Sequence, residues 1–257
     1  LQVLPFCWDV EGKRWFHVYN EERIPPHDQL FWTRPMQNWD HMCADCHSTN
    51  VRKKFDSDTE RFATSFSEIN VSCEACHGPA EKHVAMARAG DWKGDAFFGL
   101  ADVKSDNRAQ LESCAKCHAR RSTVDLNHHV GDKFTDHYLL ELLEPWAARV
   151  GSPAYHPDGQ IDEEVYVTGS YVQSKMFHKG VKCVDCHDPH TARTLTTGNA
   201  LCMRCHIPKP ENPTLYDSPS HHHHPVGTKG SQCVECHMPE KNYMVVDPRR
   251  DHSIRVP

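Results

Sequence analysis

Apolar and polar residues alternate over short stretches of this chain. Residues 3–10 and 14–19 form two such runs, separated by Glu11-Gly12, and this pattern predicts two short strands joined by a turn. A weaker alternation over residues 55–66 predicts a small hairpin. Runs of this length predict strands of a few residues rather than a broad sheet.

Helical spacing is confined to a few segments. Pro79 suits the first turn of a helix that we expect to run to about Ala89. Residues 164–179 are expected to be helical by their end. An apolar stripe at helical spacing predicts a packing helix that Pro145 ends or kinks, formed by Tyr138, Leu139, Leu142, Leu143 and Trp146. The predicted fold class is mainly α with extensive coil and a few short strands.

Six pentapeptides of the form Cys-x-x-Cys-His interrupt this pattern, and they use twelve of the thirteen cysteines. This is the attachment signal for a c-type haem, in which two thiols bond to the haem edge and the adjacent histidine ligates the iron. Only Cys7 is left over, and we expect it to be a small, buried apolar residue. The predicted thioether residues are Cys43, Cys46, Cys73, Cys76, Cys114, Cys117, Cys183, Cys186, Cys202, Cys205, Cys233 and Cys236. The predicted proximal iron ligands are His47, His77, His118, His187, His206 and His237.

Zinc knuckles, disulfides and thioredoxin-like redox pairs also use paired cysteines. Zinc sites accept Cys-x-x-Cys, but nothing in them requires histidine after the second cysteine every time. Disulfides do not require this repeat either. Six identical repeats therefore favour six covalently attached haem c groups.

Composition agrees with a core built around cofactors. Apolar residues make up 38% of the chain, below the usual 45–50% or so. Six haems in 257 residues leave about 43 residues for each haem, too few for a large side-chain core. We expect the porphyrins to supply much of the interior and the apoprotein to be largely unfolded, as zinc modules are without metal.

Charge and hydropathy limit the kinds of partner that we expect for this chain. The formal net charge is -6, and the 29 Lys and Arg residues form no basic stripe that would suggest nucleic acid. No apolar run reaches the roughly 18 residues of a membrane span. Covalent haem attachment takes place outside the cytoplasm, so we expect a signal peptide to have been removed and the protein to be periplasmic or extracellular.

Histidine is abundant enough to supply second axial ligands. Of 21 histidines, 15 lie outside the motif positions, and imidazole is a common haem ligand. The predicted distal ligands are His17, His83, His178, His190, His223 and His252, with His41, His128, His129 and His137 in reserve. Within the run of four histidines at 221–224 we expect one or two axial ligands. Methionine is the competing ligand, and Met176 and Met244 are the freest to serve.

Several longer stretches resemble a known family. Phe66-Ser-Glu-Ile-Asn-Val-Ser-Cys73-Glu-Ala-Cys76-His77-Gly-Pro, Asp185-Cys-His-Asp-Pro-His190 and Tyr243-Met-Val-Val-Asp-Pro-Arg-Arg-Asp-His252 are similar to multihaem cytochromes that often carry tetratricopeptide repeats after the haem domain. They are more distantly similar to the group of pentahaem nitrite reductase and hydroxylamine oxidoreductase. The resemblance implies closely packed haems that are mostly bis-His.

The family pattern also differs from this chain. Members typically have a further Cys-x-x-Cys-His site near the N-terminus and helical repeats at the C-terminus, and both are absent here. We expect one hexahaem domain over residues 1–257, either naturally short or a fragment of a longer product. Its segments are a strand-containing start (1–40), haems one to three (41–118), a haem-free helical interval (119–182), and haems four to six with a tail (183–257).

The leading functional hypothesis is an electron relay between redox protein partners, as a single protein or within a larger complex or filament. Bis-His iron has no free position for substrate. The alternative is a reductase of a small nitrogen or sulfur oxyanion, which needs one open iron and nearby proton donors. The Cys-x-x-Cys-Lys variant of nitrite reductase is absent. We therefore consider an electron carrier a better hypothesis than an enzyme.

Overall fold

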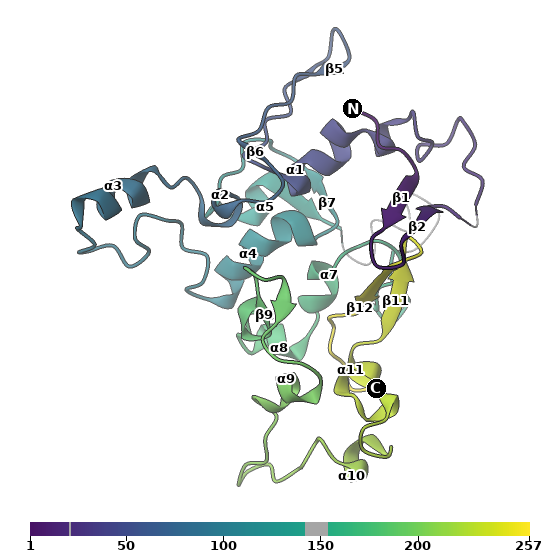
Figure 1. Cartoon of the computed structure of the whole chain (residues 1–257). Coiled ribbons are helices and arrows are strands. Elements are labelled where there is room, and N and C mark those ends of the chain that lie inside the picture. The colour runs from purple at the N-terminus through teal and green to yellow at the C-terminus, as the bar shows by residue number, and fades with distance from the viewer. Residues whose placement is uncertain (21, 142–153) are drawn as a thin grey trace. The chain divides into compact units, whose positions relative to one another are not determined.

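Short helices and short paired strands joined by coil make up the structure (Figure 1). It is a computed structural model that describes residues 1–20, 22–141 and 154–257. None of the described helices is both long enough and apolar enough to cross a membrane. The predicted fold class is therefore confirmed.

Contacts divide the chain into two compact units. Unit 1 comprises Leu1–Ser105, Glu112–Leu140 and Asn242–Asp247, and unit 2 comprises Asp106–Leu111, Glu141–Lys241 and Pro248–Pro257. Unit 1 holds the first three motifs and unit 2 the last three. The expectation of one hexahaem domain over residues 1–257 stays a prediction.

Two hairpins in unit 1 lie where the alternating patterns place them. Strand β1 (Phe6–Asp9) pairs antiparallel with β2 (Arg14–His17), and β4 (Phe55–Asp56) pairs with β5 (Arg61–Phe62). Both predictions are confirmed, with strands shorter than the sequence runs. The same region contains η1 (Pro35–Gln37), η2 (Trp39–Cys43), β3 (Ser48–Thr49) and β6 (Glu68–Ile69), and β3 pairs with β6.

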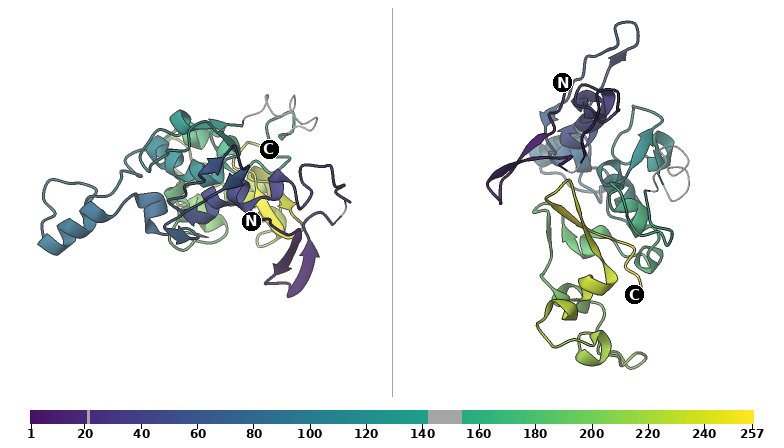
Figure 2. Two further views of the ribbon diagram at one scale, coloured as in Figure 1. Left: turned by 90° about the horizontal axis from the view of Figure 1, so that it is seen from above. Right: turned by 90° about the vertical axis from the view of Figure 1, so that its right-hand side faces the viewer.

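The predicted helix after Pro79 is also confirmed. Helix α3 covers Glu81–Ala89 and ends at Gly90, whose φ of 64° is left-handed and suits glycine. In Figures 1 and 2 this helix projects away from the rest of unit 1. Motif residues of this unit lie in the helices α1 (Ala44–His47), α2 (Cys73–His77) and α4 (Asn107–His118). The first residues of α4, up to Leu111, belong to unit 2.

The apolar stripe that begins at Tyr138 does not start as a helix. Tyr138 and Leu139 lie in β8 (Tyr138–Leu140), which follows α5 (Phe134–His137) and pairs with β7 (Arg121–Thr123). Tyr138 is buried and Leu139 is 58% exposed, so the two side chains alternate as in a strand. The helix prediction is wrong for these two residues, and its remainder, with Pro145, lies outside the described residues.

Unit 2 contains a succession of short helices, one hairpin and part of a second, whose residues Asn242–Asp247 belong to unit 1. Residues 164–179 contain two helices, as expected of their end. The elements are α7 (Thr168–Tyr171), α8 (Lys175–His178), η3 (Cys183–Asp185), β9 (His187–Asp188) paired with β10 (Arg193–Thr194), α9 (Asn199–Met203), α10 (Pro219–His222), η4 (Lys229–Ser231) and α11 (Cys233–His237). A final hairpin joins β11 (Glu240–Tyr243) to β12 (Asp247–Arg250).

The side-chain core is small, as the composition predicts. One cluster in unit 1 packs Ala115, Ala119, Phe134 and Tyr138 together, and one in unit 2 packs Ala154, Tyr155 and Val165. Across the described residues, eleven apolar side chains are buried, whereas 25 large apolar side chains are exposed. Side-chain packing alone therefore supplies little of the stability of this fold.

Candidate haem-binding sites

Helical turns bring together the three reactive side chains of the second, third and sixth motifs. Helices α2 and α11 each begin at the first cysteine and end at the histidine of their motif, and α4 ends at His118. In a helix, residues i, i+3 and i+4 share one face, so both thiols and the imidazole project to the same side. This is the arrangement that a haem needs for two thioether bonds and one axial ligand.

The donor chemistry fits haem better than zinc or disulfides. All thirteen cysteines are free thiols. In the parts of the chain that the structure describes, no three or more His, Cys, Asp or Glu side chains converge on a metal-sized point. A haem iron needs only two protein ligands, one on each side of the porphyrin plane.

The first and third motifs lie side by side in unit 1. The thiol of Cys46 is 3.9 Å from the carbonyl oxygen of Lys116 and 4.0 Å from that of Cys117. A hydrogen bond with the Cys117 thiol lowers the pKa of Cys46 to about 7, although burial opposes this shift. Attachment points of two different predicted haems are therefore in contact.

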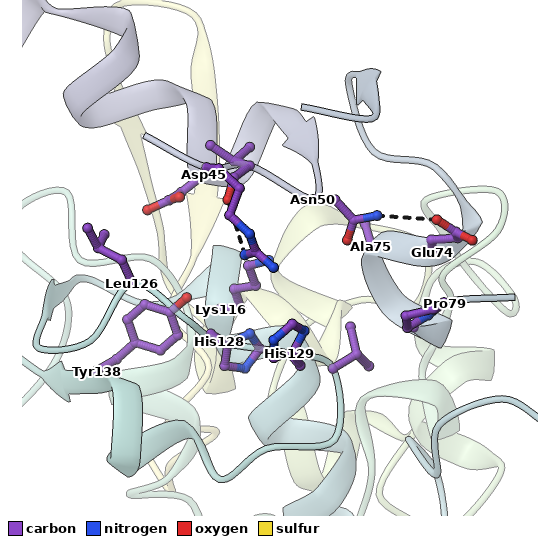
Figure 3. A pocket seen from close by; sticks show the side chains of 14 residues that line it. Asp45, Asn50, Glu74, Ala75, Pro79, Lys116, Leu126, His128, His129 and Tyr138 are labelled. Carbon is purple, nitrogen blue, oxygen red and sulfur yellow. Dashed lines mark hydrogen bonds between the residues drawn. The ribbon is translucent and has the colours of Figure 1, made fainter. Parts of the chain in front are cut away.

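All three motifs of unit 1 contribute to one polar cavity (Figure 3). Asp45, Glu74 and Lys116 come from between the two cysteines of the first, second and third motifs. The buried His128 and the exposed His129 also line the cavity. Burial lowers the pKa of His128 to about 4, helped by the positive charge of Lys116, so its imidazole is neutral at physiological pH.

The last two motifs are joined through Asn199. Its side-chain amide donates to Asp217 Oδ1 and to the carbonyl oxygen of Ser231, both at 2.8 Å, and its oxygen accepts from the backbone N–H of Cys233 at 2.8 Å. Burial raises the pKa of Cys202 to about 11, and the neighbouring Cys233 thiol adds to this shift. Motifs five and six thus present neighbouring thiols.

Two histidine pairs in unit 2 have the spacing of ligands on opposite sides of an iron. The ring centroids of His187 and His252 are 6.3 Å apart, and the angle between the ring planes is 27°. The rings of His221 and His237 are 6.2 Å apart at 6°. A nitrogen about 2.0 Å from a metal and about 1.1 Å from its own ring centre puts two opposed rings about 6.2 Å apart.

In each pair, backbone carbonyl oxygens orient one ring. His252 Nδ1 is 2.8 Å from the carbonyl oxygen of Arg250, and His237 Nδ1 is 2.5 Å from that of Arg255. A proton on Nδ1 that is donated to a carbonyl leaves Nε2 with a free lone pair for a metal. His187 with His252, and His221 with His237, would therefore each hold a haem iron through Nε2.

The structure places the other predicted distal ligands differently. His17 Nδ1 accepts a hydrogen bond from the backbone N–H of Tyr19 at 3.1 Å, so the neutral ring carries its proton on Nε2. His83 Nδ1 is 2.8 Å from the carbonyl oxygen of Phe98, which leaves its Nε2 suitable for a metal. His178 is exposed beside Phe177, and the side chain of His190 is 80% exposed, 3.7 Å from Asp188.

His221 is the residue that the sequence did not single out. His223, the predicted ligand, has a φ of 58° and caps α10, whereas His221 lies within α10 and faces His237. Four consecutive histidines offer no sequence signal that separates these two. Among the reserve histidines, His137 lies 3.0 Å from Asp125 and 3.3 Å from Asp132, and His41 packs near Phe62.

Comparisons with known proteins agree with the motifs. A family model for the doubled CXXCH motif matches residues 175–211, and one for cytochrome c554 and c-prime matches residues 24–78. No curated protein sequence matches the chain.

Two solved structures align with the chain, and the first is similar to it in fold. The outer cell wall cytochrome OcwA aligns with a TM-score of 0.62 at 17% identity, over 99% of this chain and 62% of its own. The undecaheme cytochrome from the S-layer of Carboxydothermus ferrireducens aligns with a TM-score of 0.46 at 19% identity, over 100% of this chain and 42% of its own. The chain thus spans less than two thirds of the length of either structure. The repeated attachment motifs and the two family models, each of which matches a part of the chain, are typical of multihaem c-type cytochromes.

Proposed function

We propose that this chain carries six covalently bound haems and relays electrons along them between redox protein partners. The two facing histidine pairs of unit 2 are the observation that carries this proposal. Two imidazoles on one iron leave no position for a substrate, and such a haem exchanges single electrons.

The chain's own residues hold and tune the cofactors. The twelve motif cysteines fix each porphyrin edge, and the adjacent histidines bind from one face. The carbonyl oxygens of Arg250 and Arg255 orient imidazoles, which sets their basicity and thereby the reduction potential. The neighbouring thiols of Cys46 and Cys117, and of Cys202 and Cys233, support a short separation between the first and third haems and between the fifth and sixth.

We place this relay outside the cytoplasm. Covalent haem attachment takes place there, and one structural neighbour is described as an outer cell wall cytochrome. The partners are redox proteins, or further copies of the chain in a larger assembly. His252 faces His187 of its own chain, so it is not needed as a ligand across a subunit boundary.

Haem stoichiometry and electron capacity test the proposal. Pyridine haemochrome assay and intact mass should give six haems per chain. A coulometric titration should take up about six electrons per chain, because each iron accepts one. Fewer than six of either would overturn the proposed composition.

The polar cavity of unit 1 supports a second candidate, a reductase of a small nitrogen or sulfur oxyanion. Lys116 and Tyr138 lie there beside three motifs, and both are groups that could donate protons. Steady oxidation of a reduced dye by nitrite, hydroxylamine or sulfite would support this activity. The relay predicts no turnover beyond the background of free haem.

A further inference from the structure

The C-terminal segment 249–255 contacts both facing histidine pairs of unit 2. It supplies His252 to the first pair, and its Arg255 carbonyl oxygen receives His237 Nδ1 of the second pair. One short segment thus determines the position of imidazoles at two predicted haem sites, the fourth and the sixth. The question is which residue holds this segment in place.

Asp251 is the buried anchor of the segment. It is 5% exposed, and both carboxylate oxygens are used. Oδ2 accepts from the backbone N–H of Ile161 at 2.8 Å, and Oδ1 accepts from the backbone N–H of Ser253 at 2.7 Å and from the Ser253 hydroxyl. Ile161 packs on the buried cluster around Tyr155, so Asp251 connects the segment to that cluster.

Contacts on either side of Asp251 extend this anchoring to His252. The backbone N–H of Asp251 donates to the carbonyl oxygen of Pro239 at 2.9 Å, two residues after His237. The backbone N–H of His252 donates at 3.1 Å to the hydroxyl of Ser170, a fully buried residue. The backbone on which His252 stands is therefore fixed from both sides.

A chain of side-chain contacts leads from Asp251 to Arg255. The Ser253 hydroxyl donates to Asp251 and accepts from Arg255 Nε at 2.9 Å. Arg255 also pairs with Asp158 at 3.4 Å. These contacts restrain the Arg255 side chain, and they thereby limit the movement of the residue whose carbonyl oxygen orients His237.

We propose that Asp251 is a positioning residue for two haems: it holds His252 opposite His187 and, through Ser253 and Arg255, it fixes the orientation of His237. This inference rests on the proposed bis-His ligation. Loss of the carboxylate leaves three donors without their acceptor and releases the segment, because buried donors without partners are costly. The fourth haem then loses its distal ligand, while the sixth keeps both ligands in an altered orientation.

Low-temperature electron paramagnetic resonance of the oxidised holoprotein tests this inference. Asp251→Ala should convert about one sixth of the iron to high spin and shift one further low-spin signal, leaving four unchanged. His252→Ala should give the same high-spin fraction without the additional shift. Added imidazole should restore low spin in both variants. Asp58→Asn, in the exposed turn between β4 and β5, is the matched control and should match the wild type.

Each outcome separates the inference from the function on which it rests. If the wild type is fully low-spin and Asp251→Ala has the same spectrum, the positioning role is overturned and the relay stands. A high-spin fourth haem in the wild type overturns the bis-His relay itself. If Asp251→Ala does not fold, Ser253→Ala decides: it should shift the signal of the sixth haem alone, and an unchanged spectrum would overturn the proposal.

Discussion

The side-chain oxygen of Asn199 accepts the backbone N–H of Cys233 at 2.8 Å, which links the helices of the fifth and sixth motifs. The same amide donates to Asp217 and to the carbonyl oxygen of Ser231. One side chain therefore satisfies three partners at the point where two predicted haems attach. Few apolar contacts are available at this point to replace the hydrogen bonds of Asn199.

Replacing Asn199 should loosen this link. Asn199→Ala removes three hydrogen bonds, and we expect it to lower the free energy of unfolding of the holoprotein by about 1–3 kcal/mol. Asn199→Asp should cost at least as much at neutral pH, since it sets a second carboxylate against Asp217. Guanidinium unfolding followed at the haem absorbance measures both, with Asn127→Ala, an exposed site with only local contacts, as the control. Equal stability of all three variants would contradict this role.

The histidine run offers a matched pair of variants. His221 faces His237, whereas His223 only ends the helix, so His221→Ala should open the sixth haem and His223→Ala should not. We expect about one sixth of the iron to become high-spin in the first variant, because five-coordinate iron has a weaker ligand field. Optical and magnetic resonance spectra of the oxidised proteins distinguish the two. The reverse pattern would return the assignment to His223.

A close backbone approach positions His83. A Cβ at Gly99 would lie 2.7 Å from the backbone nitrogen of His83, and Gly99 also has a φ of 80°. Gly94 has a similar φ of 83° but nothing within 4 Å, so Gly94→Ala is the control for backbone strain alone. We expect Gly99→Ala to lower the free energy of unfolding by about 1–3 kcal/mol more than Gly94→Ala does. The midpoint of thermal unfolding should therefore be lower for Gly99→Ala than for Gly94→Ala. Similar midpoints would mean that α3 does not pack closely on Gly99.

Asp45 balances two cations in unit 1. Its carboxylate is 3.0 Å from Lys53 and 3.7 Å from Arg121, and the side chains of both cations are at most 10% exposed. Asp45→Ala leaves two poorly solvated cations without their partner and should destabilise the holoprotein by about 3–5 kcal/mol. Asp56→Ala, in the exposed β4–β5 hairpin, is the control. Chemical denaturation of the two variants gives the comparison, and an effect no larger than that of Asp56→Ala would refute the assigned role.

Sequence alone could predict the attachment sites because their chemistry is local. Cys233, Cys236 and His237 share a helix face by spacing alone. The helix from Glu81 to Ala89 was equally predictable, since Pro79 favours its start and Gly90 its end. These features depend on residues a few positions apart.

The distal ligands depend on contacts that sequence spacing does not encode. His252 lies 65 residues after His187, and the fold of unit 2 brings them together. His221 and His223 differ in backbone conformation, not in residue type. Tyr138 and Leu139 were misassigned because a short apolar run suits either a helix or a strand, and burial of Tyr138 beside Phe134 favours the strand.

The proposed relay requires that both axial positions of every iron are filled. Low-temperature electron paramagnetic resonance of the oxidised wild-type protein, with haem quantified by pyridine haemochrome, tests it most directly. The account predicts six haems per chain, all low-spin, with spectra unchanged by nitrite, hydroxylamine or cyanide. A high-spin signal that shifts on adding one of these ligands would contradict it and would indicate an open iron suited to catalysis.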